Sequence, residues 1–252
     1  MKYRTLGDTG VLVSELCFGT MGFGGTDMWA NVGKTQQDEA DRLVGIAIDA
    51  GINFFDTANI YSTGISEQIL GKSLGTKRKN VILATKVRGK MGEGVNDVGL
   101  SRVHIMQQVD ESLKRLGTEY IDLYQIHGFD ILTPLEETLR ALDDLVKSGK
   151  VRYIGCSNLT AWQLMKSLWI SDKNGFNKFK SLQAYYSIAG RDLEREIVPL
   201  LKDQKLGLMV WSPLAGGFLS GKYRRNQMPE EYSRRKEFDF PPINKEKAFN
   251  II

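Results

Sequence analysis

Four side chains that can take part in proton transfer follow apolar runs of the chain. Asp56 ends the run at residues 52–55, Tyr61 comes five residues later, and Lys86 and His127 each end a later run. A free tyrosine has a pKa of about 10, so a neighbouring cation such as Lys86 would make its hydroxyl a better proton donor. Asp56 could then hold the lysine charged, and His127 could donate a hydrogen bond or relay the proton. If the four side chains meet, they form a general acid–base site.

Each of these residues also has a purely structural interpretation. An aspartate often begins a turn after a strand, and a single lysine usually lies on the surface. Tyr61 taken alone would be a half-buried packing residue, and His127, one of two histidines, would be a satisfied core or loop residue. All four stand at the ends of apolar runs, which favours a catalytic site. The other histidine, His104, follows Ser101 on an amphipathic stretch and is predicted to be structural.

The rest of the chain alternates short apolar runs with amphipathic stretches. The runs are nearly continuous, which is typical of strands covered on both faces, and they occupy residues 15–21, 52–55, 81–85, 120–126, 151–156, 181–186 and 206–211. Helices are predicted between Thr35 and Gly51 and at residues 66–74, 101–116 and 134–147. Thr35 with Asp38 gives a capping signal for the first helix, and Thr133 is the predicted N-cap of the last. This alternation predicts parallel strands with right-handed crossovers.

The predicted architecture is an α/β fold, a (β/α)8 TIM barrel that forms one domain over residues 1–252. A barrel builds its active site from the C-terminal ends of its strands, where the four side chains stand. An open doubly wound sheet is the alternative, but no Gly-x-Gly-x-x-Gly turn follows the first strand. Residues 2–4 and 11–13 flank a turn and predict an N-terminal β-hairpin. Seven strand–helix units are found, so we expect the eighth βα unit to be missing at the C-terminal end.

Composition narrows the class of protein. The chain has 252 residues, of which 42% are hydrophobic and 25% charged, and a net charge of +4 that is spread along the sequence. This balance is typical of a globular protein and does not favour a nucleic-acid partner. Cys17 and Cys156 lie in apolar runs, so we expect two buried free thiols, with no disulfide and no metal site. Neither an apolar leader nor a run of about 18 apolar residues occurs, so a cytoplasmic protein without a membrane partner is expected.

The stretch from Asp56 to Gly71 carries a specific motif, Asp-Thr-Ala-x-x-Tyr-x-x-Gly-x-Ser-Glu-x-x-Leu-Gly. It resembles the signature of the aldo-keto reductase family. The resemblance extends to about Lys222 and includes Thr85-Lys86, Ile126-His127, Thr133-Pro134-x-Glu136-Glu137-Thr138, Gly149-Lys150-Val151-Arg152-x-Ile154-Gly155-x-Ser157-Asn158, Gln183-x-x-Tyr186-Ser187-x-x-x-Arg191 and Trp211-Ser212-Pro213-Leu214. It implies an eightfold barrel that uses NADPH or NADH without a metal.

The resemblance implies reduction of aldehydes or ketones to alcohols, a reversible hydride transfer to a small-molecule carbonyl compound. The carbonyl carbon receives a hydride and its oxygen a proton, so Tyr61 becomes the general acid. General acid catalysis is worth about 10² to 10⁴ in rate. Phe23 and Trp29, together with Tyr61 and His127, predict an apolar pocket for the substrate. The oligomeric state is left open.

The resemblance and the side-chain chemistry together predict a cofactor site. Ser157, Asn158 and Gln183 suit a carboxamide, Trp211 could stack on a nicotinamide ring, and the glycine-rich residues 212–222 could receive a pyrophosphate on backbone N–H groups. Asn158 could instead cap a helix, and the glycine-rich stretch could be a flexible loop without a ligand. The predicted cofactor-binding residues are Gly19, Thr20, Met21, Asp56, Ser157, Asn158, Gln183, Trp211, Ser212, Pro213, Leu214, Gly217, Leu219, Gly221 and Lys222.

Several alternatives stay open at this point. The resemblance implies NADPH, but NADH is not excluded because the segment that recognises the adenosine 2′-phosphate lies beyond the seventh unit. Glu67 either touches the cofactor or only opens its helix. The chain could also be a nucleotide-binding regulatory subunit that resembles the β subunits of voltage-gated potassium channels. A Schiff-base aldolase that uses Lys86 as its nucleophile is a third hypothesis.

Overall fold

A sheet of seven parallel strands forms the centre of the protein in a computed structural model that describes residues 1–26, 29–225, 235 and 238–252. Each strand pairs with the next one along the chain. The strands are β3 (Phe18–Gly19), β4 (Phe54–Asp56), β5 (Ile82–Val87), β6 (Ile121–Ile126), β7 (Val151–Ser157), β8 (Ser181–Tyr185) and β9 (Gly207–Trp211). This order has no switch point, which rules out the doubly wound alternative.

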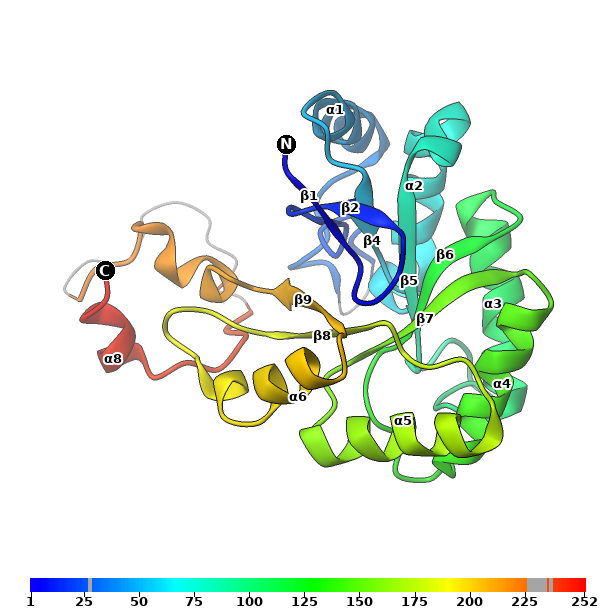
Figure 1. Cartoon of the computed structure of the whole chain (residues 1–252). Coiled ribbons are helices and arrows are strands. Elements are labelled where there is room, and N and C mark those ends of the chain that lie inside the picture. Colours follow the sequence, from blue (N-terminus) through cyan, green and yellow to red (C-terminus); the bar gives the residue numbers. More distant parts are fainter. Residues whose placement is uncertain (27–28, 226–234, 236–237) are drawn as a thin grey trace.

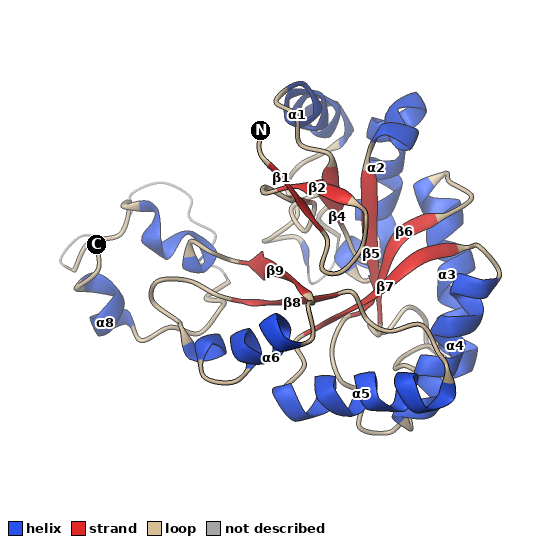
Figure 2. Cartoon of the chain, viewed as in Figure 1, coloured by secondary structure: helices blue, strands red, loops and turns tan. Residues whose placement is uncertain are grey.

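Helices connect the strands on the outer side of the sheet, which curls as Figure 1 shows. Each main helix packs against the next one in the chain. The helices are α1 (Gln37–Asp49), α2 (Ile65–Leu74), α3 (Arg102–Leu116), α4 (Leu135–Lys147), α5 (Ala161–Asn174) and α6 (Ile197–Asp203), with α8 (Lys245–Phe249) near the C-terminus. Short 3-10 helices are η2 (Tyr61–Gly64), η3 (Gly75–Asn80), η4 (Asp192–Glu194) and η5 (Ala215–Ser220). Figure 2 shows the resulting helix layer around the strands.

Two short strands before the sheet, β1 (Tyr3–Thr5) and β2 (Leu12–Ser14), pair antiparallel. The backbone N–H of Ser14 donates to Oδ1 of Asn53 at 2.7 Å, just before β4 begins. A Cβ on Gly7, in the turn between the two strands, would stand 2.5 Å from the carbonyl of Lys180, just before β8. Only a glycine fits this approach. The pair therefore covers the N-terminal ends of the parallel strands.

The direction of each side chain follows from the alternation of the strands. Phe54, Ala84 and Leu123 pack inside the curl against the β1–β2 pair. The residues that follow them point outward and join the main core beneath the helices, and they are Phe55, Thr85 and Tyr124. One further position along each strand returns to the inner face, and there stand Asp56, Lys86 and Gln125. Strand geometry alone thus places three polar side chains together above an apolar floor.

The structure differs from the sequence-based expectations in several details. The N-cap of α4 is Pro134 and not Thr133, whose hydroxyl instead donates to Asp130 at 2.7 Å. The N-cap of α1 is Gln36, one residue after the expected Thr35. Cys17 is exposed, whereas Cys156 is buried as expected. Among the described residues no eighth strand extends the seven-stranded sheet, so the closed eightfold barrel and the missing eighth unit stay predictions.

Candidate active site

The ammonium group of Lys86 lies at the centre of the candidate active site. The Lys86 side chain is fully buried on the inner face of β5. Its Nζ donates to Oδ2 of Asp56 at 2.6 Å and to the carbonyl of Thr57 at 2.8 Å. The same nitrogen lies 3.4 Å from the hydroxyl of Tyr61. Burial alone would lower the pKa of Lys86, but the charge of Asp56 and the Tyr61 oxygen outweigh it and raise this pKa. The amine is charged at neutral pH and can stabilise negative charge on the Tyr61 oxygen.

Buried hydroxyl groups fix the segment that carries Tyr61 from β4 to α2. The hydroxyl of Ser66 donates to the carbonyl of Thr20 at 2.8 Å, and it lies 2.9 Å from the Thr20 hydroxyl and 3.1 Å from that of Thr57. All three side chains are fully buried. The segment is thus tied at Thr57, next to Asp56, and at Ser66, in the first turn of α2. Tyr61 lies between these two ties, which limits how far its ring can move.

Two amide groups hold the other oxygen of Asp56. Gln125 donates from Nε2 to Oδ1 at 2.9 Å, and Gln183 donates to the same oxygen at 3.0 Å. Lys86 occupies Oδ2, so both oxygens of the carboxylate are engaged. Sequence reasoning missed Gln125, which sits inside an apolar run. The available signal was its position, two residues before His127 and therefore on the same face of the strand.

His127 comes directly after β6 and faces Tyr61. The two ring centroids lie 5.7 Å apart and the rings meet nearly edge to face, at 79°. Burial, and then the positive charges of Lys86 and Arg88, lower the pKa of His127 to about 3. The imidazole is therefore neutral at neutral pH. A neutral ring can donate a hydrogen bond to a substrate oxygen, but it does not carry the proton that an imidazolium would deliver.

The loop after β3 supplies one wall of the site. The hydroxyl of Ser62 donates to the carbonyl of Phe23 at 2.9 Å and accepts from the N–H of Gly25 at 2.9 Å. This ties the loop beside Tyr61, whose ring meets that of Trp29 at 5.5 Å and 67°. The ring of Phe23, in contrast, lies in the main core and is 3% exposed. Trp29 therefore contacts the candidate general acid, whereas Phe23 does not line the pocket as expected.

Residues 15–249 match a family model described as the aldo/keto reductase family. The chain belongs to this family. It is 41% identical over 248 residues to an uncharacterised oxidoreductase, YrpG, of Bacillus subtilis, a match that covers 94% of the chain and 74% of that relative. It is 41% identical over 240 residues to a versiconal hemiacetal acetate reductase of Aspergillus parasiticus, covering 87% of the chain and 69% of the relative.

A relative with a different description also matches this aldo/keto reductase. A probable voltage-gated potassium channel subunit beta of Oryza sativa subsp. japonica is 36% identical over 236 residues, which covers 92% of the chain and 69% of that protein. Relatives named as oxidoreductases or reductases support an oxidoreductase here. The family resemblance inferred from the sequence is thereby confirmed.

The first group of predicted cofactor residues in this aldo/keto reductase lies beside Asp56. Gly19 pairs with Asp56 in the sheet, and the N–H of Thr20 donates to the Asp56 carbonyl at 2.9 Å. The hydroxyl of Thr20 is engaged by Ser66, so this side chain is part of the scaffold of the site. Met21 follows at the surface of the same strand end and is half-buried. These residues are therefore close to the acid–base centre, and Thr20 contributes through its backbone and its support of Ser66.

The second group lies at the ends of β7 and β9. Oδ1 of Asn158 accepts from the indole N–H of Trp211 at 3.0 Å, and its Nδ2 donates to the carbonyl of His127 at 3.3 Å. Ser157 donates to the carbonyl of Gln183 at 3.0 Å. Asn158 is not a helix cap, because Thr160 caps α5 in a capping box. The structure brings these residues together, but the Gln183 side-chain amide points to Asp56.

The ring of Trp211 contacts two other aromatic rings. Phe240 stacks on it at 5.4 Å and 8°, and Tyr185 meets it at 5.1 Å and 39°. Phe240 belongs to the segment after residue 238, far from Trp211 in the sequence. A nicotinamide ring that stacked on the face of Trp211 covered by Phe240 would have to displace Phe240.

The glycine-rich stretch after β9 has features that fit a phosphate group. Gly216 and Gly217 have φ values of 62° and 92° in η5, a left-handed backbone in which successive N–H groups can converge on an anion. Nζ of Lys222 lies 4.0 Å from the place that a Cβ would take on Gly217. These features fit the pyrophosphate of a dinucleotide. The other predicted residues of this stretch lie in or beside the same turn, and they are Ser212, Pro213, Leu214, Leu219 and Gly221.

Glu67 stands in the first turn of α2, as one of the two interpretations had it, and it also has a structural role that was not considered. It is fully buried, accepts from the hydroxyl of Thr85 at 2.5 Å and pairs with Arg115 at 2.6 Å. Thr85 lies on the outer face of β5, so Glu67 joins α2 to β5 and to α3. It is part of the packing behind Lys86 and does not reach the inner face of the sheet.

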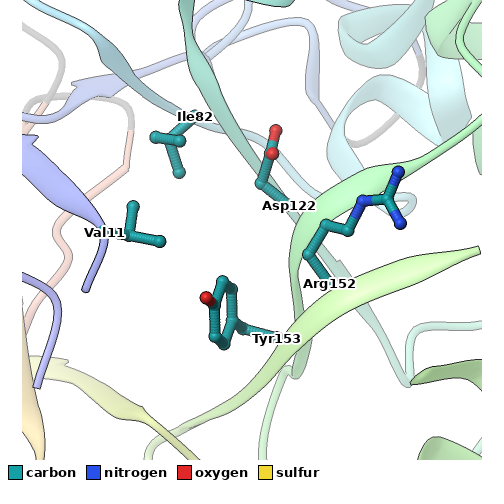
Figure 3. A pocket seen from close by; sticks show the side chains of 5 residues that line it. All are labelled: Val11, Ile82, Asp122, Arg152 and Tyr153. Carbon is teal, nitrogen blue, oxygen red and sulfur yellow. The ribbon is translucent and has the colours of Figure 1, made fainter. Parts of the chain in front are cut away.

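A separate hollow lies at the opposite, N-terminal end of the strands. It is lined by Val11, Ile82, Asp122, Arg152 and Tyr153, and none of the acid–base residues borders it (Figure 3). Asp122 already pairs with Arg78 at 2.8 Å. Within the described part of the chain, no cluster of side chains fits a metal ion, and no helix is long and apolar enough to cross a membrane.

Proposed function

We propose that the protein reduces aldehydes or ketones to alcohols with a hydride from a nicotinamide cofactor, and that Tyr61 gives the proton to the carbonyl oxygen. One observation carries this proposal: the buried Nζ of Lys86 touches both the carboxylate of Asp56 and the hydroxyl of Tyr61. A cation held at this place stabilises the phenolate that remains after proton transfer. The relatives named as reductases support the same class of reaction.

The residues divide the work of proton transfer. Asp56 keeps Lys86 charged and in place, and the amides of Gln125 and Gln183 hold Asp56. Neutral His127 donates a hydrogen bond to the substrate oxygen and so orients the carbonyl toward Tyr61. The cofactor, when bound, supplies the hydride to the carbonyl carbon. We propose NADPH, with NADH as the alternative, held by Asn158 and by the turn around Gly217.

A nucleotide-binding regulatory subunit is the second candidate, favoured by the similarity to a potassium channel subunit beta. The intact contacts among Asp56, Lys86 and Tyr61 favour the enzyme. A Schiff-base aldolase is disfavoured, because its lysine must be an uncharged nucleophile. Here the pKa of Lys86 is raised, and Nζ already donates to Asp56 and Thr57.

The decisive experiment compares the full-length protein with Tyr61→Phe. Oxidation of NADPH and of NADH is followed by absorbance over a panel of aldehydes and ketones, and the cofactor Kd is measured by fluorescence. Tyr61→Phe should lower kcat by about 10² to 10⁴ and leave the cofactor Kd nearly unchanged. Tyr153→Phe, in the hollow at the other end of the strands, is the matched control. A Tyr61→Phe protein that keeps most of its turnover would overturn the proposed role.

A further inference from the structure

Arg88 stands next to His127 at the rim of the candidate active site. It comes two residues after Lys86, and the N–H of His127 donates to the carbonyl of Val87 at 2.9 Å. Arg88 and His127 are therefore neighbours at the ends of β5 and β6. Arg88 follows the end of β5 with a φ of 154°, and its positive charge is one of the causes that lower the pKa of His127. A cationic side chain thus stands directly beyond the proton-transfer residues.

The guanidinium of Arg88 lies beside Gly128. Three of its side-chain atoms, Cδ, Nε and Cζ, lie 3.7 to 3.8 Å from the place that a Cβ would take on Gly128. The Nε of Arg88 donates to the carbonyl of Phe129 at 3.0 Å. The group therefore lies along the backbone that follows His127, held by one hydrogen bond. Its two terminal nitrogens form no hydrogen bond with the residues that the structure describes, and the side chain is exposed.

No carboxylate in the described part of the chain pairs directly with Arg88. In contrast, Lys86 pairs with Asp56, and Lys90 pairs with Glu93 at 2.8 Å. Asp130 lies near enough for the charge of Arg88 to lower its pKa, but the two form no direct ion pair. The Asp130 carboxylate instead accepts from the N–H of Leu100 at 2.7 Å and from two further donors. A guanidinium with free terminal N–H groups binds a carboxylate with two parallel hydrogen bonds.

We propose that Arg88 binds a carboxylate on the carbonyl substrate, so that the enzyme prefers aldehydes or ketones with a negatively charged group away from the reacting carbon. This rests on the proposed function. Arg88 would be a specificity-determining residue, because it anchors one end of the substrate while Tyr61 and His127 hold the carbonyl at the other. A purely structural alternative exists, in which Arg88 only ties the loop at Phe129.

The test uses matched pairs of substrates that differ in charge. Para- and meta-carboxybenzaldehyde and succinic semialdehyde are each compared with their methyl esters, by kcat/KM with NADPH. The wild-type protein should prefer the acid in at least one pair. Arg88→Met should reduce the acid-to-ester ratio about tenfold or more, mainly through KM, which is the loss expected for a charge-assisted hydrogen bond. Arg88→Lys keeps the charge but not the paired donors, so its acid-to-ester ratio should lie between those of the wild type and Arg88→Met.

Two controls separate the possible failures. Lys90→Met removes a nearby cation that is already paired, and its acid-to-ester ratio should match that of the wild type. The wild-type ratio should fall as salt is added, because the contact is exposed. Reduction of the esters without any acid preference, or equal loss on acid and ester in Arg88→Met, would overturn the role of Arg88 alone. No reduction of any aldehyde would overturn the proposed function and this inference with it.

Discussion

Gln125 donates to the oxygen of Asp56 that Lys86 leaves free. The distance is 2.9 Å from Nε2 to Oδ1, while Nζ of Lys86 lies 2.6 Å from Oδ2. Both oxygens of the carboxylate are therefore hydrogen-bonded, which restricts its rotation. Since the direction of Asp56 sets the direction of Lys86, a residue outside the family motif helps to aim the cation at Tyr61.

Gln125→Met should lower kcat about tenfold, or about 1.4 kcal/mol of barrier, because Asp56 then keeps one amide donor and aims Lys86 less well. Stability should change by no more than about 1 kcal/mol. The exchange also removes Oε1, a buried acceptor that has no partner in the described part of the chain. Steady-state kinetics and urea unfolding check both numbers. An unchanged kcat would mean that Gln125 serves only the fold.

Lys86→Met should abolish turnover and lower the free energy of unfolding by about 3 to 5 kcal/mol, because it leaves Asp56 as a buried carboxylate without its cation. The double variant Lys86→Met with Asp56→Asn should regain most of this stability and none of the activity. Urea unfolding and the aldehyde assay are run on both proteins. If the single variant is as stable as the double one, the buried charge is not the cause of the loss.

His127 should stay neutral down to acidic pH. Burial, Lys86 and Arg88 lower its pKa to about 3, whereas an unfolded histidine has a pKa of about 6.5. Between these values the unfolded chain binds a proton that the folded chain does not bind, so the free energy of unfolding falls as the pH falls below about 6.5. An NMR titration of the two histidines should show no protonation of His127 above about pH 4.

The matching stability experiment uses both histidine positions. Burial also lowers the pKa of His104, so this residue adds to the same pH dependence. His127→Asn should therefore reduce, but not remove, the loss of stability between about pH 6.5 and about pH 5. His104→Asn measures how much of the remaining pH dependence comes from His104. A His127→Asn protein with the same pH dependence as the wild type would contradict a lowered pKa at this position.

Arg115→Met should lower the free energy of unfolding by about 3 to 5 kcal/mol, because Glu67, fully buried, loses its cation. Lys114→Met is the matched control. The pair of Lys114 with Glu111 is exposed, so its loss should change stability by less than about 1 kcal/mol. Thermal or urea unfolding distinguishes the two. If both variants lost the same free energy of unfolding, the burial of Glu67 would not add to the strength of its ion pair.

The sequence predicted what depends on local pattern. The parallel strands and the meeting of Asp56 with Lys86 follow from apolar runs and from strand alternation, both of which can be seen in a few neighbouring residues. The role of Gln125 could not be predicted, because a single polar residue within an apolar run gives no indication of its partner. Its partner, Asp56, lies 69 residues away in the sequence. That Gln125 points to the inner face of the sheet indicates a role in the site only once Asp56 is known to be its partner.

Other differences have the same physical origin. Gln183 is predicted to bind a carboxamide, and its Nε2 in addition donates to Asp56, which is 127 residues away. Trp211 has the ring of a stacking residue, and Phe240 covers it. Phe23 comes from the loop that forms the wall, yet its ring is in the core. In each case residue type suggested a role, while a contact between distant segments decides where the side chain points.

The alternation that brings Asp56, Lys86 and Gln125 inward also sets what kinds of change the protein can tolerate during evolution. Deletion of a single residue within β5 would turn Lys86 toward the helices and bring Thr85 to the inner face. Substitutions and insertions in the loops after the strands leave this order untouched. New substrate preferences can therefore arise by exchanging loops. The acid–base centre is kept as long as the number of residues in each strand is unchanged.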